Sequence, residues 1–177
     1  MVVSAVLKHN YEVSRDDLLR LQREQHRHDQ RNHSDIACLA KSDRLKHYGL
    51  HFAKYVGRLA RGDIEVHSFD RTLTDTALIC LSTANTLHQR LDKCALDKPS
   101  LAVQVDQLRP FADAAGRFAD ACEKIDHLEE FVSIARTANE EILNWVLGAV
   151  RERELNLEAA IRIRRTELAD RQFFIAD

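Results

Sequence analysis

The chain has 177 residues, a length that fits one domain and is short for two. Its five glycines and two prolines are fewer than strand-rich proteins use, whereas 45% hydrophobic and 31% charged residues are typical of amphipathic helices around a core. The formal net charge of −2 excludes the strongly basic surface of a nucleic-acid-binding protein, so any basic site must be local.

Two features bear on location. The N-terminal stretch "MVVSAVLKHNYEVSRDD" contains an apolar run too short for a signal peptide or a membrane span. The four cysteines form no CxxC pair, and Cys80 and Cys94 fall on an apolar helical seam, which favours buried free thiols. We therefore expect a cytoplasmic protein with no membrane partner.

The first predicted helix begins after Ser14, whose side chain can cap the amide of Asp17, and ends before a linking turn at 32–42. A second helix is predicted from an N-cap at Ser42 to a C-terminal glycine, Gly62. Its apolar residues recur at spacings of three and four, which indicates a packing seam. They are Leu45, Tyr48, Phe52, Tyr55 and Leu59.

The third predicted helix starts near Asp70 and is stopped by Pro99. Its apolar seam alternates steps of four and three without a miss, which favours bundle packing at shallow crossing angles. The seam residues are Leu73, Ala77, Cys80, Ala84, Leu87, Leu91 and Cys94.

Three further segments complete the predicted bundle. Ser100 can cap a segment that Pro110 kinks or divides. Asp126 and Glu129 form a capping-box-like start for a long helix, and Asn156 can cap the last one. The seam of the long helix is Leu128, Phe131, Ala135, Ala138, Ile142, Trp145 and Ala149. These patterns predict an all-α bundle of five or six helices, in a single domain over residues 1–177.

A basic stripe runs along the second predicted helix, within the stretch "HYGLHFAKYVGRLARG". His47, His51, Lys54 and Arg58 lie within about 60° of one another on a helical projection. Their mutual repulsion costs a few tenths of a kcal/mol per pair, which a neighbouring anion would relieve. One interpretation is a solvated face whose long side chains cover neighbouring surface.

Two other interpretations give the stripe a ligand. His47 and His51 could share a metal ion, with Asp75 of the next helix as a third ligand. Alternatively, the stripe is an anion site in which Lys54 and Arg58 face a phosphate or carboxylate. The rings of Tyr48 and Tyr55, at the border of the stripe, would then be available for stacking.

Two segments carry a family resemblance. Residues 51–60, "HFAKYVGRLA", and 72–87, "TLTDTALICLSTANTL", resemble the two core helices of the MazG-like all-α nucleoside triphosphate pyrophosphatases. That family has an E-E-x-x-E motif on one helix, with Gly before the last Glu and Leu-Ala after it. The next helix has E-x-x-D and an Asn ten residues beyond the Asp. The matching positions here are Gly57, Leu59, Ala60, Asp75 and Asn85.

The acidic residues of these motifs are mostly replaced. Lys54, Tyr55, Arg58 and Thr72 stand where the family has glutamates, and only Asp75 remains. The family's carboxylates hold magnesium ions that bridge a triphosphate and activate water. A change of register does not restore them, because residues 44–62 contain no Asp or Glu.

The resemblance and its departures together imply a MazG-like protein that binds a nucleotide or other phosphorylated small molecule, with little or no pyrophosphohydrolase activity. Whether it is an enzyme stays open; a retained activity would be that of a nucleotide pyrophosphohydrolase-like hydrolase. No cofactor is expected, and magnesium is possible but not favoured. No metal ligands are assigned. The expected ligand-binding residues are His47, His51, Lys54, Tyr55, Arg58, Asp75 and Asn85.

Different functions remain open beside this one. The chain could be a helical oligomerisation or adaptor protein whose basic stripe pairs with an acidic helix, within the subunit or across a dimer. The acidic residues are Glu129, Glu130, Glu140 and Glu141. A His-based metalloenzyme is a third alternative. A homodimer or higher oligomer is expected in the first two cases. The arginines of the last helix lack interleaved aromatic residues, so nucleic-acid contact is not expected.

Overall fold

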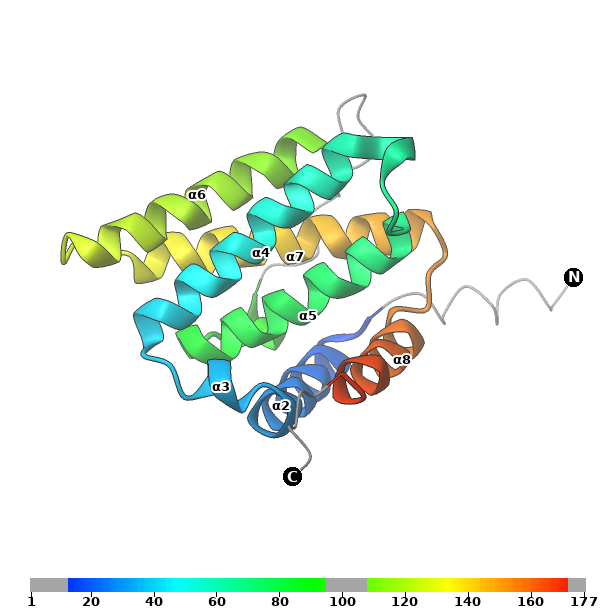
Figure 1. Cartoon of the computed structure of the whole chain (residues 1–177), viewed down its shortest axis with the longest axis horizontal. Coiled ribbons are helices and arrows are strands. Elements are labelled where there is room, and N and C mark those ends of the chain that lie inside the picture. Colours follow the sequence, from blue (N-terminus) through cyan, green and yellow to red (C-terminus); the bar gives the residue numbers. More distant parts are fainter. Residues whose placement is uncertain (1–12, 95–107, 172–177) are drawn as a thin grey trace, which may run out of the picture.

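A computed structural model describes residues 13–94 and 108–171, which form seven α-helices and no β-strand (Figure 1). The predicted all-α class is therefore confirmed. The helices are α2 (Arg15–Asn32), α3 (Ser34–Ala37), α4 (Lys41–Arg61), α5 (Phe69–Leu87), α6 (Leu108–Asp126), α7 (Val132–Glu152) and α8 (Leu157–Ala169). The predicted count of five or six is too low because a one-turn helix, α3, lies in the predicted linking turn.

Helix α5 is the centre of the fold. It packs against α4 and α7 on one side and against α2 and α8 on the other, while α6 covers α4 and α7 (Figure 1). Because other helices cover α5 on both sides, its side chains must be apolar or must have their polar atoms hydrogen-bonded. Accordingly, the buried hydroxyls of Thr72, Thr74 and Thr76 each donate to the carbonyl four residues earlier.

The helix ends test the predicted caps. Ser14 accepts from the amide of Asp17 in a capping box, and Asn156 accepts from the amide of Ala159, so both predicted caps are confirmed. The cap at Ser42 is wrong: α4 begins one residue earlier, at Lys41, without a side-chain cap. Segment 95–107, with the predicted cap at Ser100, lies outside the described residues.

The third predicted helix is too long. It ends at Leu87 because His88 adopts a left-handed conformation with φ 51°. The guanidinium of Arg136, from α7, then donates to the carbonyls of Leu87 (2.6 Å) and His88 (3.3 Å). These bonds satisfy carbonyls that would otherwise continue the helix. A short 3₁₀ helix, η3 (Leu91–Lys93), follows, so Leu91 still reaches the core.

Two predictions about the second half of the bundle also need correction. Pro110 does not divide the helix, since it lies in the first turn of α6, where its missing N–H has no helical partner to lose. Asp126 ends α6 rather than starting the next helix, and Leu128 is 94% exposed. Helix α7 starts at Val132, where the side chain of Glu130 accepts from the amide of Ser133.

Aromatic packing holds α6 against α4 and α7. Phe52 of α4 and Phe118 of α6 meet edge to face with ring centroids 5.0 Å apart, and Phe111 lies 4.9 Å from Trp145. Cys80 is fully buried and Cys94 partly so, and all four thiols are free. Within residues 13–94 and 108–171, no helix has the length and apolar character needed to cross a membrane.

Candidate functional site

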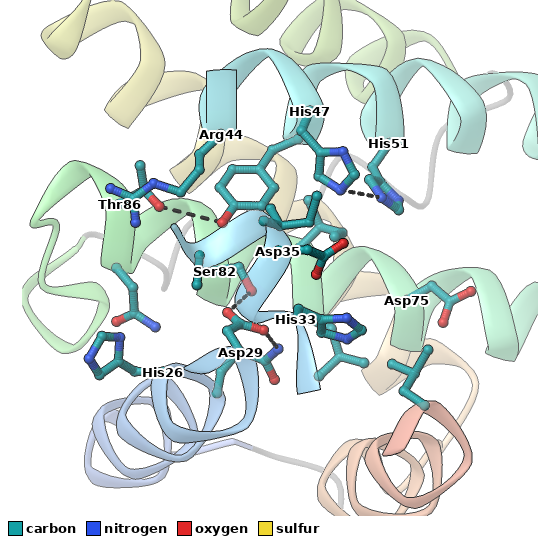
Figure 2. Close-up of a pocket in the computed structure, with 18 of the residues that line it drawn as sticks. His26, Asp29, His33, Asp35, Arg44, His47, His51, Asp75, Ser82 and Thr86 are labelled. Carbon is teal, nitrogen blue, oxygen red and sulfur yellow. Dashed lines mark hydrogen bonds between the residues drawn. The ribbon is translucent and has the colours of Figure 1, made fainter. Parts of the chain in front are cut away.

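One cavity of about 700 Å³ brings together all seven expected ligand-binding residues. Helix α4 forms one wall of the cavity, and α2 and α3 form the opposite wall (Figure 2). Residues of α5 line the cavity between these walls, and α8 lies at one end. Five Lys or Arg side chains and three carboxylates line it, in a chain whose net charge is −2. The cavity therefore has a local excess of basic over acidic side chains, in contrast to the chain as a whole.

The basic stripe lies on the α4 wall of the cavity, and it has one more residue than the four predicted from the sequence. Arg44 lines the same cavity, three residues before His47. Arg44, His47, His51, Lys54 and Arg58 follow one another at steps of three and four, so they share one helix face. Arg44 and Arg58 are 14 positions apart, which corresponds to about 21 Å along the helix axis. The spacing alone could have revealed Arg44.

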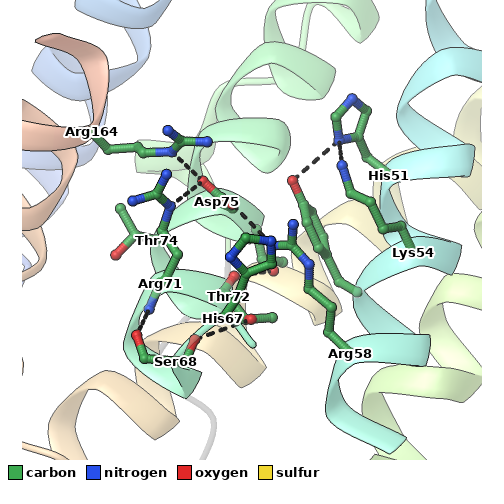
Figure 3. Close-up of polar contacts among 12 residues, drawn as sticks. His51, Lys54, Arg58, His67, Ser68, Arg71, Thr72, Thr74, Asp75 and Arg164 are labelled. Atoms are coloured by element: carbon green, nitrogen blue, oxygen red, sulfur yellow. Dashed lines mark hydrogen bonds and ion pairs between the residues drawn. The ribbon is translucent and has the colours of Figure 1, made fainter. Parts of the chain in front are cut away.

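An arginine cluster surrounds Asp75 at one end of the cavity (Figure 3). Nη1 of Arg58 lies 3.1 Å from Oδ2, and Nε of Arg164 lies 2.6 Å from Oδ1. Nε of Arg71 lies 3.5 Å from Oδ1, while Glu167 pairs with Arg71 and Arg164. Three guanidinium groups thus share two carboxylates, and the Asp75 side chain is only 8% exposed.

This geometry does not fit the magnesium site of the MazG-like enzymes. Both oxygens of Asp75 already face arginines, and Thr72 donates its hydroxyl to the backbone of Ser68. In the part of the chain that the structure describes, no group of three His, Cys, Asp or Glu side chains could hold a metal ion. The interpretation of His47, His51 and Asp75 as a metal triad therefore lacks its geometry.

His51 is held as a neutral imidazole. Its Nδ1 accepts from Nζ of Lys54 at 2.9 Å, which assigns the ring hydrogen to Nε2. Nε2 then donates to Nε2 of His47 at 3.2 Å. Burial, followed by the charges of Lys54 and His47, lowers the pKa of His51 to about 3. Burial also lowers the pKa values of His47 and Lys54.

Lys54 is the cation of the stripe that an anion could reach most directly. It is exposed, lines the cavity and has no carboxylate partner among the described residues. Its Nζ lies 5.0 Å from the ring centroid of Tyr55, whose face is also 5.4 Å from the Arg58 guanidinium. Tyr55 is buried beneath these cations, and Tyr48 is buried too, so the expectation of free rings for stacking is wrong.

The wall opposite α4 is polar. Asp29 of α2 accepts from Oγ of Ser82 (2.6 Å) and from Nε2 of Gln25 (2.8 Å), and burial raises its pKa. Asn85, expected to bind ligand, donates from its amide nitrogen to the carbonyl of Gln22 at 3.0 Å. That bond anchors α5 to α2, so at least this half of the Asn85 amide is structural.

The acidic residues of the adaptor hypothesis do not reach the basic stripe within the chain. Glu129 pairs with Lys124 at 2.8 Å, Glu130 binds Ser133, and Glu141 pairs with Arg117. The side chain of Glu140 forms a hydrogen bond with the thiol of Cys94. Pairing inside the subunit is therefore wrong, because α7 lies on the far side of α5 from the cavity. Pairing across a dimer stays a prediction.

No protein-family model matches the chain, and no curated protein or solved structure is significantly similar to it. The MazG-like resemblance therefore rests on residues 51–60 and 72–87, which lie in α4 and α5.

Two partly buried histidines, His28 and His51, predict a pH-dependent stability. Burial lowers the pKa of His28 to about 4 and that of His51 to about 3, whereas an unfolded histidine titrates near pH 6.5. Between pH 6.5 and about 5 the unfolded chain therefore binds more protons than the folded one, and stability must rise with pH. We expect the urea midpoint to fall steadily as the pH is lowered from 7 to 5.5.

The matched variants are His51→Gln and His127→Gln. The first removes one of the two imidazoles with a strongly lowered pKa, so the pH dependence should become shallower. The second changes an exposed histidine of the α6–α7 loop and should leave the dependence as it is. Equal wild-type midpoints at pH 7 and 5.5 would show that these histidines are protonated in the folded state.

Proposed function

We propose that the chain binds a nucleotide or another phosphorylated small molecule in the cavity between α4 and α2, as a MazG-like protein without the family's magnesium-dependent hydrolysis. The observation that carries this proposal is the excess of cations in the cavity, five Lys or Arg against three Asp, in a chain of net charge −2. A phosphate would neutralise that excess.

The cavity suits a small molecule in size as well as in charge. Its volume of about 700 Å³ falls within the range of small-molecule sites, roughly 300–1,000 Å³. Lys54 supplies a point charge, while the cluster of Arg58, Arg71 and Arg164 offers guanidinium groups in excess over its carboxylates. His51, next to Lys54, would gain a proton more readily beside a bound anion.

The same residues argue against hydrolysis of the MazG type. Two magnesium ions need several oxygen ligands, and the carboxylate that the resemblance retains is held by arginines. Cations can bind phosphate and offset its charge, but they provide no bound water to act as a nucleophile.

The test is calorimetric titration with nucleoside di- and triphosphates, using Lys54→Gln and Lys46→Gln. We expect Lys54→Gln to weaken nucleotide binding by about 10- to 100-fold, the usual value of one charged hydrogen bond. Lys46 is on the same helix but pairs with Asp126 outside the cavity, so its replacement should leave affinity unchanged. Arg58 is unsuitable, because its removal leaves Asp75 less paired.

Two results would contradict the proposal. If the wild-type protein does not bind nucleotides, the proposed ligand class is wrong. Rapid, magnesium-dependent release of pyrophosphate would show that carboxylates outside the matched motif positions form a metal site.

A further inference from the structure

At the opposite end from the Asp75 cluster, the cavity has another cation without a carboxylate partner. This cation is Arg44, which lines the cavity near Thr86 (Figure 2). Its Nε is buried and finds no hydrogen-bond acceptor, and its guanidinium forms no ion pair with any residue in 13–94 or 108–171. A buried donor left unbonded is unfavourable, so a ligand that accepts a hydrogen bond from Nε would bind more tightly by doing so.

Arg44 and Lys54 are too far apart to be served by one phosphate. Ten residues separate them on a continuous helix, which corresponds to about 15 Å along its axis. A phosphate group is much smaller than that separation, so one phosphate does not reach both positions. Each end needs an anion of its own.

The middle of the cavity has the opposite character. Asp29 and Asp35 lie between the two ends, with Ser82 beside them (Figure 2). Carboxylates there would repel a chain of phosphates that ran through the whole cavity. They would instead accept from N–H or O–H groups, such as those of a sugar or a base.

We propose that the ligand carries two separate anionic groups, one held by Lys54 and the arginine cluster and the other by Arg44, joined by a part rich in hydrogen-bond donors. A nucleoside 3′,5′-bisphosphate has this chemistry, because a sugar and a base join its two phosphates, and a mononucleotide phosphorylated at one end does not. This inference rests on the proposed function, because it assigns a ligand class to the same cavity.

The experiment compares three ligands by calorimetry at fixed ionic strength: a nucleoside 5′-diphosphate, the isomeric nucleoside 3′,5′-bisphosphate, and linear inorganic polyphosphate. We expect the wild-type protein to bind the 3′,5′-bisphosphate at least tenfold more tightly than either other ligand. Arg44→Gln should remove about tenfold of affinity for the 3′,5′-bisphosphate and change that for the nucleoside 5′-diphosphate by less than twofold. Lys54→Gln should weaken both.

The control is Arg23→Gln, which changes an exposed arginine of α2 outside the cavity and should alter neither affinity. The wild-type comparison stands even if Arg44→Gln fails to fold. If no ligand binds, the proposed function itself fails. If the nucleoside 5′-diphosphate or polyphosphate binds as tightly as the 3′,5′-bisphosphate, or Arg44→Gln weakens all ligands alike, only the ligand with two separate anionic groups is overturned.

Discussion

Replacement of Asp75 with alanine is expected to lower the free energy of unfolding by about 3–5 kcal/mol, the usual cost of removing one partner from a buried ion pair. Asp75 accounts for one of the two carboxylates among three guanidinium groups, and Arg58 and Arg164 are nearly as buried as Asp75 itself. Without it, Glu167 alone faces Arg71 and Arg164, and Arg58 loses its carboxylate. Urea unfolding at pH 7 measures the loss.

The control for this prediction is Asp113→Ala. Asp113 pairs with Arg117 four residues later on the surface of α6, and exposed pairs of this kind contribute about 1 kcal/mol or less. A second substitution sharpens the test: Arg58→Met in the Asp75→Ala background should recover part of the stability, since it removes the buried charge that has lost its carboxylate. If Asp75→Ala costs no more than Asp113→Ala, water screens the cluster.

Phe52→Ala is the second substitution expected to have a large effect, again about 3–5 kcal/mol, because it leaves a cavity in the core. Phe52 is completely buried, and its ring packs edge to face on Phe118 between α4 and α6. Its side chain does not line the candidate site. The folded fraction should therefore bind nucleotide with unchanged affinity, which separates this effect from that of Lys54→Gln.

Leu50→Ala is the matched control for Phe52→Ala. Leu50 lies two residues earlier on the same helix and is 72% exposed, so its truncation should change stability by no more than about 0.5 kcal/mol. Chemical denaturation followed by circular dichroism gives both values. Comparable losses for the two variants would mean that the outer face of α4 is covered by another subunit.

The bundle was predictable because its signals are local. A seam such as Leu73, Ala77 and Ala84 repeats within one helix, and each of its members is buried. The end of α5 was not predictable in the same way. It depends on Arg136, a residue almost 50 positions further along the chain, which binds the last carbonyls of the helix.

The candidate site shows the same division. The stripe from His47 to Arg58 could be read from spacing, and the structure places it on a cavity. The pairing of Asp75 with Arg164 could not be predicted, because Arg164 lies 89 residues away in the last helix. Asp29 was missed for a similar reason: its contact with Ser82 joins helices that are 53 residues apart in sequence.

The central position of α5 has a consequence for motion. Helices α2 and α8 and helix α4 each pack on α5, but α2 and α4 meet chiefly across the cavity. A molecule that contacted both walls of the cavity would link α4 to α2, which otherwise are connected chiefly through α5. Opening of α2 and α8 away from the bundle would then require that molecule to leave first, and its occupancy would set how often they open.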